Sequence, residues 1–201
     1  MLPDGYTPLL PRRLATLTTY LRAEIPARAT MPPMPMPFRL ERLKGADVAR
    51  YLALFRAVGS PWLWFGHLVK TEGEIAALLD DADYECYALA GGRDAGLLSL
   101  DFRNAEEVWL DYFGLVPGVI GEGLGRSLIK AGFARVAKRG KPALHVHTLH
   151  VHTCTFDHPK ALAFYMKNGF VPYARAVECF EDPRLNGLLP RDCAPWLPMI
   201  E

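Results

Sequence analysis

The sequence lacks the marks of several large protein classes. Its four cysteines are widely separated and form no CxxC pair, so neither a zinc knuckle nor a redox motif is indicated, and we expect reduced cysteines in a cytoplasmic protein. No apolar run approaches the length of a membrane span. Residues 14–21, behind Arg12 and Arg13, are too short and too rich in threonine for a signal-peptide core. The 23 basic and 22 acidic residues nearly cancel, so no nucleic acid or membrane partner is indicated.

The sequence does contain enough apolar residues for one packed domain. Half of the 201 residues are hydrophobic and 22% are charged, as in ordinary globular proteins. Residues 15–22 alternate and are rich in threonine, which allows a strand, whereas residues 31–37 consist only of methionine and proline and fit an extended linker. We expect an N-terminal arm and linker over 1–37, the domain over 38–178, and a C-terminal tail over 179–201 packed on the domain.

From residue 38 onward the pattern predicts strands and helices in a mixed order. Alternating or β-branched stretches predict strands over residues 38–43, 84–90, 96–102, 108–116, 144–153 and 170–177. Apolar residues at helical spacing predict helices over 47–58, from the capping box Thr71/Glu74 to 79, over 127–138 and over 159–168. Strands dominate early and then alternate with helices, which predicts an α+β fold.

A glycine-rich loop between a strand and a helix is the most informative segment. Residues 120–126 read Ile-Gly-Glu-Gly-Leu-Gly-Arg. Glycine lets backbone N–H groups approach an anion, and the following helix adds its unpaired first-turn N–H groups and the positive end of its dipole. Arg126 at the helix start adds a charged donor. The loop therefore predicts pyrophosphate binding, and a structural turn without ligand is the alternative.

Two other phosphate-binding motifs fail on specific residues. A Walker A loop needs a lysine before Ser127, where Arg126 stands. A dinucleotide fingerprint that begins at Gly121 needs glycine at position 126 and an acidic residue about twenty positions further on, but residue 143 is alanine. Neither nucleotide motif explains the loop.

A second segment lies forty residues beyond the loop. Residues 161–170 read Ala-Leu-Ala-Phe-Tyr-Met-Lys-Asn-Gly-Phe. This segment is similar to the Ala-x-x-x-Tyr-x-x-x-Gly-Phe pattern of the GNAT superfamily of acyl-CoA-dependent N-acetyltransferases, and residues 120–125 are similar to its pyrophosphate motif, Gln/Arg-x-x-Gly-x-Gly/Ala. The resemblance covers residues 38–178. It implies a mixed, mostly antiparallel sheet of about six to seven strands flanked by about four helices, with acetyl-CoA as co-substrate and no metal.

The resemblance also implies which residues contact the cofactor. In the family, the strand before the loop is splayed from its neighbour and holds the pantetheine arm and the thioester through its backbone, a role that falls on Leu115 and Val116. Two positions depart from the family pattern: Ile120 replaces the usual Gln or Arg, and His158 replaces an Asn that contacts the pantetheine in many members. The implied cofactor-binding residues are Leu115, Val116, Gly121, Glu122, Gly123, Leu124, Gly125, Arg126, Ser127 and His158.

Acetyl transfer from a thioester needs a base for the amine and a proton for the leaving thiolate. Tyr165 falls on the family's tyrosine near the cofactor sulfur, where a phenol can protonate the thiolate. Trp109 aligns with the position of a catalytic Glu in many members. Alternation along the strand predicts that Trp109, Asp111 and Phe113 point together, which makes Asp111 the candidate base and a structural carboxylate the alternative. Glu107 lies on the same expected face, nearer the start of the strand.

Aromatic and histidine residues indicate where the acceptor amine binds. Trp62 and Trp64 lie between the first two expected helices, where the family builds part of its acceptor pocket, and such a cluster binds apolar or cationic groups. A hydrophobic lid over the core is the alternative. The four histidines between positions 145 and 152 alternate between two faces of their expected strand, so they do not converge on a metal. His152 and Trp109 complete the acceptor-binding candidates.

The sequence therefore predicts an N-acetyltransferase that moves an acetyl group from acetyl-CoA to an amine of unknown identity, by direct attack in a ternary complex. A catalytically silent acyl-CoA-binding or regulatory module is the alternative, favoured by Trp109 and opposed by Tyr165. A nucleotide-binding protein, whose ATP or NAD would not be displaced by CoA, is a third hypothesis. The expected partner is a small-molecule or peptide amine, and the proline-rich arm suits contact with a second subunit in a homodimer.

Overall fold

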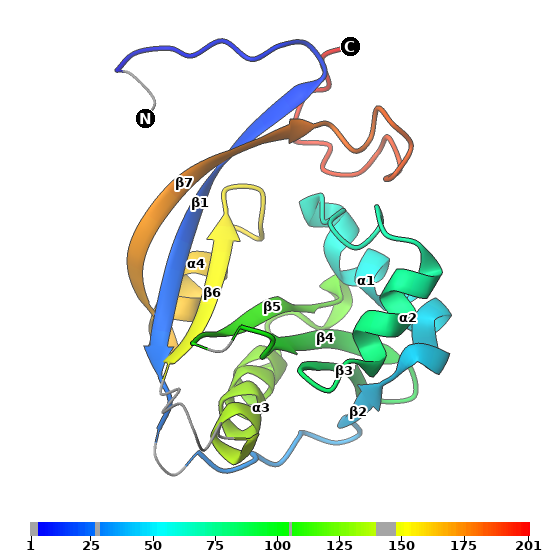
Figure 1. Cartoon of the computed structure of the whole chain (residues 1–201), viewed down its shortest axis with the longest axis vertical. Helices are drawn as coiled ribbons and strands as arrows, with labels where there is room; N and C mark the ends of the chain where they lie inside the picture. The colour runs from blue at the N-terminus through cyan, green and yellow to red at the C-terminus, as the bar shows by residue number, and fades with distance from the viewer. Residues whose placement is uncertain (1–3, 27–28, 105, 140–147) are drawn as a thin grey trace.

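A computed structural model describes residues 4–26, 29–104, 106–139 and 148–201 of the chain. Its strands form one sheet, and its helices pack on both faces of that sheet (Figure 1). The strands are β1 Arg13–Glu24, β2 Arg39–Leu43, β3 Tyr84–Ala90, β4 Asp94–Asp101, β5 Val108–Leu115, β6 Thr148–Cys154 and β7 Val171–Glu181. The α-helices are α1 Val48–Gly59, α2 Glu72–Asp80, α3 Leu124–Arg139 and α4 Ala161–Lys167. None of these described helices is long and apolar enough to cross a membrane.

The described strands form a seven-stranded sheet in the order β2-β3-β4-β5-β6-β1-β7. Neighbouring strands are antiparallel, except for the parallel pair β5–β6. Parallel strands need a long crossover, and α3 lies in the chain between these two. The expected α+β fold with a mostly antiparallel sheet is confirmed.

Strand β1 brings the N-terminal segment into the sheet. It lies within the expected arm, yet it pairs with β6 through Thr18 opposite Cys154 and with β7 through Thr16 opposite Glu178. The expected boundary at residue 37 therefore leaves out a strand of the sheet, and the expected boundary at 178 falls inside β7. The threonine-rich alternation predicted a strand, but the pairing joins segments far apart in the sequence.

Strands β5 and β6 separate after a short paired stretch. Only Val108 opposite Leu149 and Trp109 opposite His150 are paired, and the strands then diverge (Figure 1). No strand in the described part of the chain fills the gap between them. Beyond Trp109, the edge of β5 that faces β6 therefore keeps backbone N–H and C=O groups without a partner strand. This divergence agrees with the splayed strand that the family resemblance implied.

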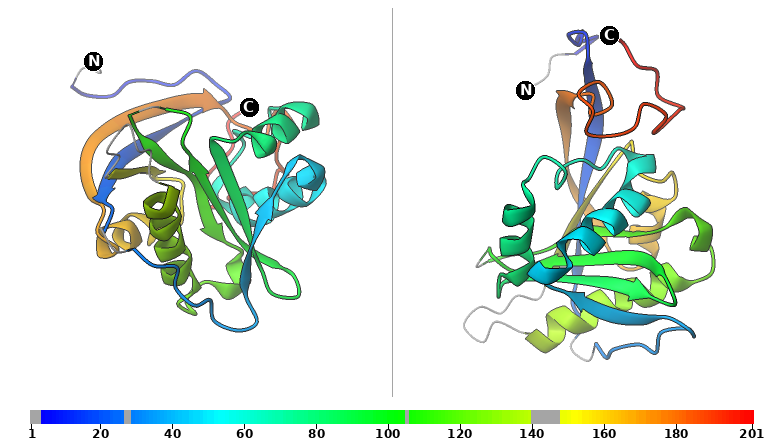
Figure 2. Two further views of the ribbon diagram at one scale, coloured as in Figure 1. Left: turned by 60° about the horizontal axis from the view of Figure 1, so that its bottom comes forward. Right: turned by 90° about the vertical axis from the view of Figure 1, so that its right-hand side faces the viewer.

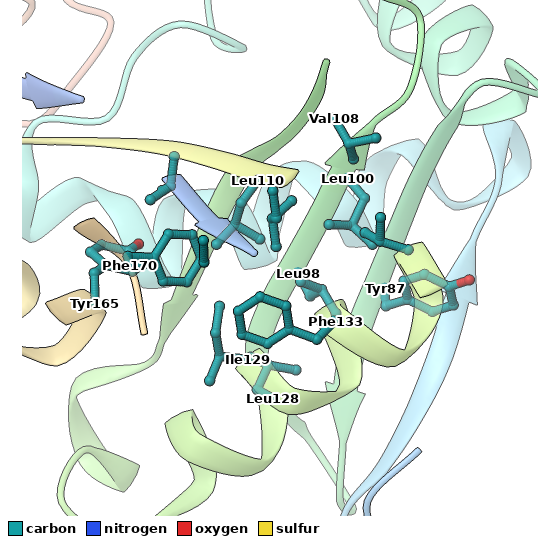
Figure 3. Close-up of a cluster of buried hydrophobic side chains, with 14 of the residues drawn as sticks. Tyr87, Leu98, Leu100, Val108, Leu110, Leu128, Ile129, Phe133, Tyr165 and Phe170 are labelled. Carbon is teal, nitrogen blue, oxygen red and sulfur yellow. The ribbon is translucent and has the colours of Figure 1, made fainter. Parts of the chain in front are cut away.

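Separate hydrophobic clusters lie on the two faces of the sheet. Helices α1 and α2 cover one face, where Tyr51 and Phe55 are buried. Helices α3 and α4 cover the other, where Leu128, Phe133 and Tyr165 pack. Figure 2 shows the two pairs of helices on opposite sides of the sheet, and Figure 3 shows the cluster under α3 and α4. A side chain of β5 therefore enters one core or the other according to its face.

Local sequence explains where the helices begin. Thr71 and Glu74 form the predicted capping box, because Thr71 Oγ1 accepts the Glu74 N–H (3.2 Å) and Glu74 Oε2 accepts the Thr71 N–H (2.7 Å). Asp47 precedes α1 as predicted, but its carboxylate accepts the N–H of Lys44 (2.9 Å) and no helix N–H. Helix α3 begins before the predicted residue 127, since the chain turns at Gly123 with φ of 82° and coils at once.

The C-terminal tail is fastened by one buried arginine. Arg184 is 2% exposed and forms an ion pair with Asp182 (2.6 Å). It also donates to the backbone oxygens of Cys193, Ala194 and Leu197 at 2.9 to 3.2 Å. A third hydrophobic cluster joins the tail to β1 and to the loops after α1 and β6; its buried members are Leu14, Leu63, Phe156, Leu189 and Ala194.

Candidate active site

The first of two adjoining cavities lies where the end of β5, the glycine-rich loop and α4 meet. Its volume is about 710 Å³. Its charged lining residues are all basic and are Arg126, Lys130, Lys160 and Lys167. None of these four side chains forms an ion pair with another described residue. We call this space the basic cavity, and its unpaired cations favour a ligand with several negative charges.

The glycine-rich loop presents N–H groups at the edge of the basic cavity. Gly121 and Gly123 have φ of 103° and 82°, which side chains with a Cβ rarely adopt. The N–H groups of residues 121–125 precede the first hydrogen bonds of α3, and no acceptor among the described residues takes them up. Unpaired N–H groups at the start of a long helix form an anion site.

The predicted loop residues divide into those that line the basic cavity and those that do not. The lining residues are Gly121, Gly123, Gly125 and Arg126. Leu124 is buried in the core under α3, and Glu122 and Ser127 are not part of the lining. The sequence motif marks the loop as a unit, but only the fold separates its ligand side from its core side.

Of the residues predicted to contact the pantetheine, two line the cavities and one does not. Leu115 and His158 line this cavity and the second one described below. His158 Nδ1 accepts the N–H of Lys160 at 3.1 Å, so a neutral ring carries its hydrogen on Nε2 and can donate to a ligand. The Val116 N–H donates to the Ala95 oxygen at 2.9 Å, and Val116 lines neither cavity. Of the predicted pair, the structure brings only Leu115 to the cavities.

Sequence reasoning missed the three lysines of the basic cavity. Lys130 lies one helical turn after Arg126, and this spacing on α3 was a usable signal because residues four apart share a helix face. Lys160 immediately precedes α4, and Lys167 is its last residue. Nothing in the sequence pattern places α4 beside the glycine-rich loop, so these two required the fold.

The second cavity adjoins the first and is walled by β5, the loop after α1, and strands β6, β1 and β7. Its volume is about 620 Å³, and its charged lining residues Asp111, Asp157 and Glu178 are all acidic. No lysine or arginine of the described chain lines it. We call it the acidic cavity. The residues that line both cavities are Phe113, Gly114, Leu115, Ile120, His158, Ala161 and Tyr165.

Tyr165 stands at the junction of the two cavities. It is 6% exposed, and its ring lies 6.1 Å from that of Phe113 and 5.5 Å from that of Phe170. Figure 3 shows Tyr165 beside Phe170 at one end of the buried cluster. Burial raises the pKa of Tyr165 well above its usual value. The hydroxyl therefore keeps its proton at neutral pH and acts as a donor.

Asp111 lies in the acidic cavity with one carboxylate oxygen engaged. Its Oδ2 accepts a hydrogen bond from the Tyr84 hydroxyl (2.7 Å) and lies 3.8 Å from His67 Nε2. Its Oδ1 has no hydrogen-bond partner among the described residues. Burial raises the pKa of Asp111, and the Tyr84 hydrogen bond opposes that rise. The geometry leaves one oxygen free to take a proton.

His67 supports Asp111 from behind, and sequence reasoning missed it. It is 6% exposed, and its Nδ1 is hydrogen-bonded to the Tyr51 hydroxyl. Burial lowers the pKa of His67 to about 4, so the ring is neutral at pH 7. If the Tyr51 hydroxyl donates to Nδ1, the ring hydrogen lies on Nε2 and faces Asp111. A lone histidine between two helices carries no sequence signal for this role.

A β-bulge corrects the predicted alternation along β5. Leu98 pairs with Phe113 and Leu100 with Leu110, so two residues of β5, Asp111 and Tyr112, lie opposite one residue of β4. The prediction that Phe113 shares a face with Asp111 is wrong, because the extra residue shifts the alternation. Phe113 packs in the core under α3 and α4, whereas Tyr112 packs in the core under α1 and α2.

The two predicted acceptor tryptophans of the loop after α1 line the acidic cavity and contact the loop after β6. Trp64 Nε1 donates to Asp157 Oδ1 at 3.1 Å. Asp157 Oδ2 accepts from the Thr153 hydroxyl (2.7 Å) and from the Cys154 N–H (2.9 Å), so this carboxylate is held by the protein. The ring centroids of Trp62 and His158 are 5.1 Å apart. These contacts join the two walls of the gap between β5 and β6.

Trp109 is not part of the acidic cavity lining, unlike the other acceptor candidates. Its Nε1 donates to Glu107 Oε2 at 2.9 Å, and its ring lies 5.1 Å from that of His150. His152 lines the cavity, and its ring lies 6.5 Å from that of Trp109. His152 is therefore part of the acidic cavity lining, and Trp109 is not. Residues 145 and 147 lie outside the described residues, so the expected arrangement of the four histidines stays a prediction.

Comparison with solved structures identifies the fold. A GCN5-related N-acetyltransferase from Sphaerobacter thermophilus matches 83% of this chain and 52% of its own with a TM-score of 0.60 and 16% identity. A protein of the GNAT family from Novosphingobium aromaticivorans matches 86% of this chain and 69% of its own with a TM-score of 0.54 and 20% identity. This chain has the GNAT fold.

The likeness extends to a conserved protein of unknown function. That protein, from Staphylococcus epidermidis, matches 85% of this chain and 63% of its own with a TM-score of 0.61 and 14% identity. This chain thus spans less than two thirds of the Staphylococcus and Sphaerobacter proteins. No protein-family model and no curated protein matches the sequence. Within the GNAT fold, the reaction must therefore be inferred from the cavities themselves.

Proposed function

We propose that this protein is an N-acetyltransferase that moves an acetyl group from acetyl-CoA to a primary amine in a ternary complex. One observation carries the proposal: a cavity with only basic charges and a cavity with only acidic charges meet at Tyr165. The basic cavity suits a polyanionic cofactor and the acidic cavity suits a cationic acceptor, so that their reacting groups would meet where the two cavities join.

The residues of the basic cavity fit acetyl-CoA, whose nucleotide end carries several phosphates. The free N–H groups of residues 121–125 and the helix start behind them suit the diphosphate. The four unpaired cations, Arg126 among them, suit the remaining phosphate charge. The unpaired edge of β5 beyond Trp109 offers backbone groups to the pantetheine amides, as an added strand would use them.

Two side chains supply the proton transfers. Asp111 Oδ1 accepts a proton from the attacking amine as the N–C bond forms. Tyr165 donates its hydroxyl proton to the sulfur as the C–S bond breaks, and regains a proton through the cavity. A base that lies in the acidic cavity and an acid at the junction act on opposite sides of the transferred acetyl group.

The test uses the purified full chain, acetyl-CoA and a panel of primary amines. Amine-dependent release of free thiol, with acetylated amine detected by mass spectrometry, supports the proposal. Binding of acetyl-CoA without thiol release from any amine would favour the silent acyl-CoA-binding module. Cytoplasmic localisation, consistent with the four free cysteines, and a homodimer stay predictions from the sequence.

A further inference from the structure

The acidic cavity contains more negative charge than a single amine requires. Both carboxylate oxygens of Asp157 already accept hydrogen bonds from neutral donors, which are Trp64, Thr153 and the Cys154 backbone, although its negative charge still contributes to the cavity. Asp111 keeps one free oxygen for the reacting amine. The carboxylate of Glu178, an exposed residue of β7 that lines the cavity, has no hydrogen bond or ion pair among the described residues. When Asp111 is assigned to the reacting amine, the carboxylate of Glu178 therefore remains free to bind a second group.

Glu178 lines the same cavity as the reacting end but comes from a different strand. It lies on β7, while Asp111 and Tyr112 lie on β5, and all three line the same cavity. Burial chiefly raises the pKa of Tyr112, and the charges of Asp111 and Glu178 raise it further. Glu178 is thus close enough to Tyr112, on β5, for its charge to act on that residue. A ligand between the walls lies between two carboxylates.

A buried hydroxyl on the same wall is also without a partner. Thr18 on β1 is 4% exposed and lines the cavity, and its Oγ1 has no hydrogen-bond partner among the described residues. An unsatisfied buried polar atom is costly, so native proteins rarely retain one without a ligand or water. Thr18 is therefore a second polar group that a ligand donor can satisfy.

The rest of the lining favours organic cations over other donors. Aromatic faces attract ammonium groups, and the cavity volume of about 620 Å³ is within the range of small-molecule sites. No described basic side chain competes for the carboxylates. Tyr20, Trp62, Trp64, Tyr112 and Phe180 are among the aromatic lining residues.

We propose that the acceptor carries at least two ammonium groups, one acetylated near Asp111 and the other bound by Glu178 on β7 with Thr18 beside it. This inference rests on the proposed acetyl transfer and deepens it from an amine to a flexible diamine or polyamine. The group near Asp111 attacks as the neutral amine, after its ammonium form has lost one proton to solvent, and Asp111 Oδ1 takes a second proton as the N–C bond forms. The distal ammonium keeps its charge throughout.

The experiment compares α,ω-diaminoalkanes of increasing length with n-alkylamines of equal length in the acetyl transfer assay. We expect the best diamine to exceed its monoamine in kcat/KM by about fivefold, as for an ion pair to an exposed carboxylate. Glu178→Gln should abolish this preference. Glu181→Gln, on the same strand and outside the cavity, should retain it.

Binding of the same amines is measured by calorimetry without acetyl-CoA, which separates this inference from the proposed function. Transfer to both amine types at similar kcat/KM, or a preference that survives Glu178→Gln, overturns the inference and leaves the acetyltransferase intact. Diamine binding that depends on Glu178 without any transfer supports the diamine site and overturns the proposed reaction. If neither acetyl transfer nor diamine binding is observed, the inference is overturned.

Discussion

Replacing Tyr165 with Phe removes one oxygen atom from the junction of the two cavities. The ring contacts with Phe113 and Phe170 remain, and the hydroxyl makes no hydrogen bond to another described residue. We therefore expect the free energy of unfolding to change by less than about 0.5 kcal/mol, and CoA affinity to stay the same. In the proposed mechanism, the only function lost is proton donation to the leaving thiolate.

The size of the rate effect follows from that role. A positioned general acid contributes about 10²–10⁴-fold, so kcat should fall by that factor, equivalent to about 2.7–5.5 kcal/mol in the barrier. The assay is thiol release at saturating amine and acetyl-CoA, with CoA affinity measured by calorimetry and stability by thermal unfolding. Tyr173→Phe, outside both cavities, is the matched control.

Two results would refute this role for Tyr165. A kcat within about threefold of the unmodified protein would remove the hydroxyl from the proton transfers. A fall in kcat matched by an equal loss of CoA affinity would indicate a binding role instead. The tyrosine stays protonated because burial raises its pKa, so its donation should not produce a limb in the pH–rate profile below pH 9.

Further variants test the other parts of the site and the fold. Asp111→Asn should lower kcat by about 10²-fold or more and remove the rise in rate with pH that a carboxylate base gives, measured as a pH–rate profile from pH 5 to about 9. Because folding raises the pKa of Asp111, its stabilising contribution is present below the unfolded pKa and is lost as pH rises through the folded pKa. The same variant should therefore unfold at higher urea at pH 7, and unchanged urea midpoints would contradict the burial of this charge. Arg126→Ala combined with Lys130→Ala should raise the KM for acetyl-CoA about tenfold but leave turnover of S-acetylpantetheine, which lacks the nucleotide, unaffected. Arg184→Met should cost about 3–5 kcal/mol in urea unfolding, because it leaves Asp182 buried without a partner, and a cost under about 1 kcal/mol would show that the tail is held otherwise.

Local patterns were sufficient to predict much of the framework. The capping box at Thr71, the strand over 84–90, and the glycine-rich loop are each encoded in a few consecutive residues. The loop and the Tyr165 helix are sequence motifs, so a pyrophosphate site at the loop could be predicted before the fold was known. Turns and helix caps depend on residues that are close in the chain, so they can be predicted from the sequence.

The missed features depend on pairing between distant segments. The bulge at Asp111 exists only in register with β4, and it changes which face each following residue of β5 occupies. Strand β1 could be predicted as a strand, but its place between β6 and β7 is set by pairs such as Thr18 with Cys154. Near-zero net charge likewise concealed the division of charge, because basic and acidic residues are segregated by the fold.

The central claim is that free N–H groups and unpaired cations around residues 121–130 bind the phosphates of CoA. Isothermal titration of the purified chain with CoA, at low and high salt, tests it most directly. We predict saturable binding that weakens as salt rises and as Arg126 and Lys130 are replaced. An absence of binding heat with about 1 mM CoA, at either salt concentration, would contradict the claim.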